Sequence, residues 1–265
     1  FPTLGWPSDI AAWTYADLAD FYRTYYAPNN CTLVIVGDVT PAEIFELTEQ
    51  HFEPIPAQDP PPTVRTLEPE QQGQRRLYVE TPAQTPLLHV AFHSGAATDP
   101  LTQPMNLLMS ILVDGDSSRL HRLLVEDRQA AISVGGWQDE GFDPGLVYLY
   151  LTLPPGSDVA AVEARVLEEL ARVANGGITS AELSKAQNIL LADYWRGLAT
   201  INGKASALRN YEVFTGSFEN LFSEPDEISA VTREQLQAVA AKVFRRGNMT
   251  VGVLRDPAAA AGESS

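Results

Sequence analysis

The sequence predicts an α+β fold: two layers, in which an antiparallel or mixed β-sheet carries helices packed on one face. Strand-like and helix-like segments cluster in separate stretches, and this order favours the α+β class over a doubly wound parallel sheet. Within residues 145–153, Leu149 and Leu151 alternate with Tyr148 and Tyr150, which is the pattern of a strand with one buried face. A capped helix followed by an apolar strand occurs twice in the chain.

This repeated unit recurs at a spacing of 218 residues, with Thr14 against Thr232. The matching stretches are Thr14-Tyr-Ala-Asp-Leu18 with Thr232-Arg-Glu-Gln-Leu236, Asn30-Cys-Thr32 with Asn248-Met-Thr250, and Asp38 with Asp256. Each threonine begins a capping box, and residues 33–36 and 251–254 are the expected strands. The repeat predicts two similar domains, the first lying mostly upstream of Phe1. Chance similarity of two helix–strand units is the alternative.

The other elements follow from local signals in chain order. Thr40-Pro-Ala-Glu43 predicts a capped helix with proline in its first turn, running to about Phe52. Residues 54–73 are rich in proline and predict an extended, semi-rigid linker. Residues 75–81 and 87–93 then alternate as strands.

The downstream segments predict the rest of the sheet and its helices. A helix begins at Asp99-Pro100, with Met105, Leu108, Met109 and Leu112 on one face, and strands follow at 131–137 and 145–153. The next helix has an apolar stripe, formed by Val159, Val162, Val166, Leu170 and Val173, and stops at Gly176-Gly177. A long helix capped by Thr179 then runs past Trp195.

These signals divide the chain into four parts. Residues 1–53 are the C-terminal end of a first α+β domain, and residues 54–73 are the linker. Residues 74–256 form a complete second α+β domain, and the small, polar residues 257–265 are a disordered tail.

Composition excludes several classes of function. Lys and Arg total 18 against 34 Asp and Glu, a net charge of −16, so a nucleic-acid partner is excluded because a phosphate backbone would be repelled. The longest apolar runs, such as 107–113 and 146–153, are shorter than the roughly 18 residues that a membrane span needs. Cys31 is the single cysteine, which excludes an internal disulfide, and we expect it to be a small buried side chain.

No complete catalytic motif is found in the sequence, and no catalytic or metal-binding residue is assigned. The serine-hydrolase, dinucleotide and phosphate-loop motifs are missing from it. His89 and His93 have metal-ligand spacing only on a helix; on a strand they would lie about 13 Å apart, too far to share a zinc ion. His51 and His121 are expected at the surface. Asp114-Gly-Asp116 is interpreted as a helix-capping turn, since a calcium loop needs a longer series of ligands.

Several segments, in this order, resemble the pitrilysin and mitochondrial-processing-peptidase family of inverted-motif zinc metallopeptidases. They are Gly5-Trp6, Asp9-Ile10, Tyr25-Tyr-Ala-Pro-Asn-Asn30, Val34-Ile-Val-Gly-Asp38, Ser117-Ser-Arg-Leu120, Gly177-Ile-Thr179 with Glu182-Leu183, and Ala230-Val-Thr232. The resemblance implies two similar α+β domains that close over a peptide like a clamshell, so the chain would contain one clamshell half.

The resemblance also implies hydrolysis by a zinc-bound water, held by a His-x-x-Glu-His motif and a distal glutamate. That motif is not in this sequence and would lie upstream of Phe1, so zinc belongs to the parent protein and the chain alone is expected to be inactive. The implied function is the C-terminal, non-zinc-binding part of a zinc metalloendopeptidase subunit. The alternative is a catalytically inactive member that serves as a structural or assembly subunit.

A partner subunit is implied as well. Some family members carry an arginine and, seven residues later, a tyrosine, and the aligned positions here are Val125 and Ile132; a second register gives Arg128 and Gly135. The chain therefore resembles the zinc-subunit type of the two-subunit branch, with a homologous partner supplying the Arg/Tyr pair. His89 and His93 are the candidate contacts to peptide substrate. The expected location is the periplasm or the membrane periphery of a bacterium.

Overall fold

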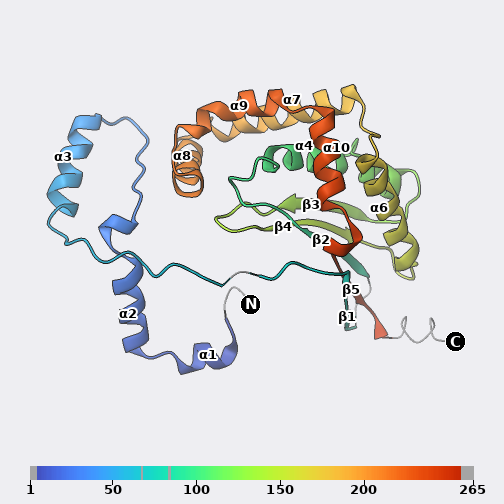
Figure 1. The fold of residues 1–265 in the computed structure, drawn as a ribbon, viewed down its shortest axis with the longest axis horizontal. Helices are drawn as coiled ribbons and strands as arrows, with labels where there is room; N and C mark the ends of the chain where they lie inside the picture. Colours follow the sequence, from blue (N-terminus) through green and yellow to red (C-terminus); the bar gives the residue numbers. More distant parts are fainter. Residues whose placement is uncertain (1–4, 67, 83–84, 258–265) are drawn as a thin grey trace.

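The computed structural model describes residues 5–66, 68–82 and 85–257, and the described part contains one five-stranded mixed sheet (Figure 1). The strand order is β1 (Arg75–Glu80), β5 (Met249–Arg255), β2 (Leu87–His93), β4 (Leu146–Thr152) and β3 (Ser133–Gln138). β1 and β5 run parallel, and the other neighbouring pairs run antiparallel. The predicted α+β class with a mixed sheet is confirmed.

Helices cover one face of this sheet (Figure 1). They are α4 (Thr102–Val113), α6 (Val159–Ala174), α7 (Ser180–Gly197) and α10 (Arg233–Val243). Alternate strand residues face them: Leu88, Val90 and Phe92 of β2 are buried, as are Leu149 and Leu151 of β4. Each such side chain contributes about 1.5–3 kcal/mol of hydrophobic free energy, so this face holds the core.

The two helices that follow α7 were not predicted from the sequence. α8 (Ile201–Thr215) begins after Thr200, whose side chain accepts a hydrogen bond from the Gly203 amide, and ends at Gly216 with φ of 79°. α9 (Asn220–Ala230) follows at once. In the described part of the chain, no helix combines the length and apolar character needed to cross a membrane.

The N-terminal helices lie apart from the sheet (Figure 1). They are α1 (Pro7–Ala12), α2 (Tyr15–Tyr25) and α3 (Pro41–Phe52), and none of them has a buried residue. Thr40 makes no side-chain cap to α3, so the capping box predicted there is wrong although the helix forms.

The predicted strand at residues 33–36 is also wrong, because this segment pairs with no other strand in the described part of the chain. A strand forms only when a neighbour receives its backbone hydrogen bonds. Cys31 was expected to be buried but is exposed, since the unpaired segment that follows it packs into no sheet. Its counterpart in the repeat, Met249, is buried in β5.

The structure confirms the helix of the repeat and adds the turn that follows it. α2 and α10 begin and end 218 residues apart, and both open with a capping box. Two 3₁₀ turns follow at the same spacing, η1 (Pro28–Asn30) and η3 (Arg246–Asn248). Asn30 Nδ2 donates to the Tyr25 carbonyl at 2.8 Å, and Asn248 Nδ2 donates to the Val243 carbonyl at 3.0 Å.

The two copies share the helix and the turn but differ in the strand, which forms only in the second copy, and in burial. Leu18 and Phe21 are each 55% exposed, whereas their counterparts Leu236 and Val239 are fully buried. Ile35 is 43% exposed and its counterpart Val253 only 3%. The first copy therefore presents an apolar face that the second copy buries against its sheet.

The proline-rich segment between the two parts contains no helix or strand in its described residues. Asn29 anchors its start, donating to the Gln58 carbonyl at 2.9 Å and accepting from the Gln58 amide at 3.1 Å. Gln71 anchors its end through Nε2, which donates to the Met249 carbonyl at 2.8 Å. The predicted disordered tail lies, beyond Pro257, outside the described residues.

A buried ion network joins α6 and α7 to the short helix α5 (Arg119–His121), which continues into the π-helical turn η2 (Arg122–Glu126). Arg119 Nε lies 2.6 Å from Glu182 Oε1, and its Nη1 lies 2.9 Å from Glu169 Oε1. Hydrogen bonding to Arg119 lowers the pKa of Glu182 to about 2. Because this pKa is lowered by folding, the contribution of Glu182 to stability is present above about pH 4.5 and is lost as the pH falls toward 2.

Replacing Arg119 with alanine should lower the free energy of unfolding by about 3 kcal/mol or more, because it leaves the buried Glu169 with less compensation. Urea unfolding measures this change. The matched control is Arg196→Ala, which removes an exposed pair with Asp193 and should cost less than about 1 kcal/mol. Equal losses in the two variants would contradict a structural role for the network.

Candidate functional site

The uncovered face of the sheet carries an aromatic cluster. The Trp137 ring lies 4.8 Å from Tyr148 and 5.6 Å from Tyr150, measured between centroids, and the His89 ring lies 6.3 Å from Tyr150. These residues belong to β3, β4 and β2. They alternate with buried core residues, so they point away from the helices.

Gly135 determines how the Tyr150 ring lies in this cluster. A Cβ atom at Gly135 would collide with the phenol end of Tyr150, so only glycine lets the ring lie across β3. Trp137 Nε1 donates to Asp139 Oδ1 at 2.9 Å, which fixes the indole. Burial and the charge of Asp139 raise the pKa of Tyr148. The result is a partly apolar surface with phenol and imidazole groups at its edge.

His89 and His93 lie on strand β2, as predicted, at positions that share the uncovered face. His89 is exposed there. His93 Nε2 lies 3.5 Å from Glu68 Oε1, so it is held beside the end of the linker. Within residues 5–66, 68–82 and 85–257, no three His, Cys, Asp or Glu side chains come together as metal ligands.

The other two histidines, His51 and His121, do not lie on the uncovered face of the sheet. His51 is exposed on α3. His121 Nδ1 lies 3.0 Å from the Asp116 carbonyl oxygen, so it closes the Asp114–Asp116 turn.

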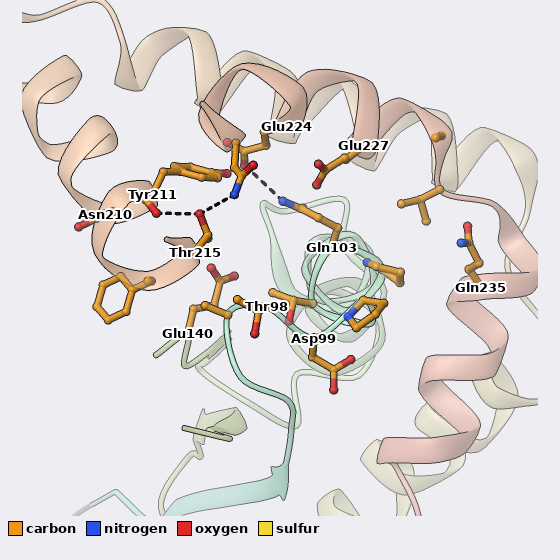
Figure 2. Close-up of a pocket in the computed structure, with 18 residues that line it drawn as sticks. Thr98, Asp99, Gln103, Glu140, Asn210, Tyr211, Thr215, Glu224, Glu227 and Gln235 are labelled. Carbon is orange, nitrogen blue, oxygen red and sulfur yellow. Dashed lines mark hydrogen bonds between the residues drawn. The ribbon is translucent and has the colours of Figure 1, made fainter. Parts of the chain in front are cut away.

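A second candidate site is a cavity of about 720 Å³ beside the helix layer (Figure 2). Its walls come from the start of α4, the loop between β3 and β4, α8, α9 and the start of α10. Figure 2 shows Glu224 and Glu227 on α9 and, across the opening, Glu140 and Asp99. Sequence reasoning missed this site because its residues come from distant segments and share no spacing motif.

Glu224 is the most enclosed of these carboxylates. Gln103 Nε2 donates a hydrogen bond to Glu224 Oε1 at 3.5 Å, and interaction with the Tyr211 side chain favours the charged form of this carboxylate. Burial is the main cause that raises its pKa, and the nearby charges of Glu140 and Glu227 raise it further. Burial and interaction with Glu224 also raise the pKa of Tyr211, so its hydroxyl remains a hydrogen-bond donor.

Val125 and Ile132, the positions aligned with the Arg/Tyr pair, have side chains that cannot donate a hydrogen bond. Val125 lies in η2 and packs against the core, and Ile132 is half exposed. In the second register Gly135 serves the tyrosine cluster described above and has no side chain to donate. The first register therefore supplies neither side chain of the pair, and the second supplies Arg128 without a tyrosine seven residues later.

Comparison with known families identifies the fold. A family model described as the peptidase M16 inactive domain matches residues 12–190, more than half of the chain. The chain belongs to the peptidase M16 family. This result confirms the resemblance drawn from the sequence, because the family's relatives are named zinc proteases and its structures share this fold.

Individual M16 relatives match a larger share of the chain than the family model does. The zinc protease PqqE of Helicobacter pylori is 27% identical over 217 residues, covering 79% of this chain and 48% of PqqE. An uncharacterized zinc protease of Mycobacterium leprae is 28% identical over 250 residues, 92% of this chain and 55% of its own. The crystal structure of a protease from Helicobacter pylori superimposes with a TM-score of 0.89 at 25% identity, covering 95% of this chain and 62% of that one. This M16 chain therefore spans about half the length of its curated relatives.

Proposed function

We propose that this chain is the C-terminal, non-zinc-binding part of a zinc metalloendopeptidase subunit that hydrolyses peptides in a chamber between two similar domains. The observation that carries the proposal is the repeated unit within an M16 chain: its first copy has the capped helix and the turn of the second but leaves its apolar face uncovered. Contiguous exposed apolar side chains of this kind mark an interface. The greater length of the relatives leaves room for a domain that would cover it.

The proposed division of the chain follows from this. Residues 1–53 would end the first domain, residues 54–73 would link the two, and residues 74–256 would be the second. The sheet and its buried core support the last assignment, since they involve only residues beyond the linker.

Zinc does not fit the described residues, because no set of three ligands converges in them. The relatives are named zinc proteases, so we assign the metal to the part of the parent protein upstream of this chain. No step of hydrolysis is assigned to residues of this chain.

The role proposed for this chain is to bind substrate and a partner. The uncovered face with His89, His93 and Tyr150 would form a wall of the chamber, where imidazole and phenol groups can hydrogen-bond a peptide backbone. A homologous subunit would supply the arginine and tyrosine that Val125 and Ile132 do not provide. On the resemblance alone, we place the enzyme in the periplasm or at the membrane periphery of a bacterium.

The second candidate is a catalytically inactive subunit with a structural or assembly role. The family description names the matched domain inactive, which agrees with this candidate and equally with the first, since relatives that match this chain are named zinc proteases. The two candidates differ in the first domain of the parent, which retains the zinc motif only if the parent is a peptidase.

The test compares the 265-residue chain with the intact gene product assembled with its partner. We expect the assembly to hydrolyse peptides in a reaction that a zinc chelator stops, because the metal activates the attacking water. The chain alone should show neither hydrolysis nor stoichiometric zinc. Chelator-sensitive hydrolysis by the chain alone would contradict the proposal, and an inactive assembly without the His-x-x-Glu-His motif would establish the structural subunit instead.

Changing both His89 and His93 to alanine in the active assembly should raise KM about tenfold and leave kcat nearly unchanged, since two hydrogen bonds to the peptide are lost away from the reacting atoms. Steady-state kinetics measure this split. His51→Ala, on an exposed helix outside the sheet, is the control and should change neither constant. An unaltered KM in the double variant would refute the contact.

A further inference from the structure

The cavity in Figure 2 carries negative charge without a cation to balance it. Its lining includes four carboxylates, and none of the described lining residues is lysine, arginine or histidine. The carboxylates are Asp99, Glu140, Glu224 and Glu227.

The hydrogen-bond partners of these carboxylates are neutral groups. Asn106 Nδ2 donates to Glu140 at 2.6 Å, and Ser223 Oγ donates to Glu227 at 2.7 Å. The Leu101 amide donates to Asp99 Oδ1 at 2.8 Å. Glu224 accepts its hydrogen bond from Gln103, as described above. The donors orient the carboxylates but leave their charges uncompensated.

Holding these charges together costs free energy in the empty cavity. Like charges repel, and partial burial weakens the screening by water. The raised pKa of Glu224 has these two causes. An arrangement that strains the folded protein is typical of a binding site, because a ligand of opposite charge relieves the strain.

The rest of the lining indicates an organic cation instead of a metal ion. Tyr211 and Phe214 contribute aromatic rings, and Pro100 and Pro104 contribute apolar surface. A guanidinium group can lie against an aromatic ring while its N–H groups donate to carboxylates. The volume of about 720 Å³ is that of a site for a small organic molecule, not for one ion.

The cavity is also open at its rim, where Thr98, Glu140 and Glu227 are exposed. A side chain carried on a longer peptide can therefore enter from the surface. Its opening lies beside the helices, whereas His89 lies on the uncovered face of the sheet.

We propose that this cavity binds the cationic side chain of a basic peptide segment, with an arginine guanidinium held by Glu224 and Glu227 against Tyr211. The same chemistry would admit a free polyamine, which the experiment distinguishes. The proposal goes beyond the peptidase function, since it requires neither zinc nor a partner subunit.

The test is isothermal titration of the 265-residue chain with N-acetyl-Arg-Arg-amide. The matched ligand replaces both arginines with citrulline, which keeps the shape and removes the charge. We expect binding of the arginine peptide at one site and a loss of about tenfold or more in affinity with citrulline. Equal binding of the two peptides, or no binding of the arginine peptide, would overturn the proposal. Tighter binding of spermidine than of the peptide would identify a polyamine site and overturn the peptide assignment.

The variant Glu224→Gln with Glu227→Gln removes two charges from the cavity, and Glu46→Gln with Glu168→Gln removes two exposed charges outside it. Only the first should weaken peptide binding, by about tenfold or more. An equal loss in both would assign the binding to net charge and overturn the site. The cavity variant should also unfold at a higher temperature than the wild type at pH 7, because repulsion is relieved, so loss of binding would not come from loss of folding.

Discussion

A strand forms only where a neighbouring strand receives its backbone hydrogen bonds, and β5 shows how much of this structure depends on that requirement. It pairs with β1 on one side and with β2 on the other, so it joins the end of the chain to the start of the sheet. Its buried residues Met249, Val251 and Val253 then meet the helix layer. The Arg119 network holds that layer together from within, fixing α5 and α7 against α6.

The same requirement explains what the sequence could and could not predict. Thr179 and Thr232 begin helices because their capping signals are local, and β4 follows from its own alternation. Residues 33–36 have an equally strong strand pattern, but pairing depends on segments distant in sequence, so the strand was predicted and does not form. Cys31 is exposed through the same error.

The two candidate sites also differ in how far the sequence predicted them. The shared face of His89 and His93 follows from the two-residue period of a strand, and sequence reasoning found it. The cavity around Glu224 depends on α8 and α9, which lacked a clear apolar stripe and were missed; their only local signals were Thr200 before α8 and Gly216 after it. The carboxylates that line it, between Asp99 and Glu227 in the sequence, are brought together only by tertiary packing. No sequence motif predicts that they lie close to one another.

In the proposed function, residues 5–53 belong to a domain whose sheet the rest of the parent protein supplies. Amide hydrogen exchange at residues 33–36, compared with residues 251–254, tests it most directly, because exchange reports whether backbone N–H groups are paired. In the 265-residue chain, 251–254 should be protected and 33–36 should exchange rapidly. In the intact gene product both segments should be protected to a similar degree. Rapid exchange at 33–36 in the intact protein would contradict the claim.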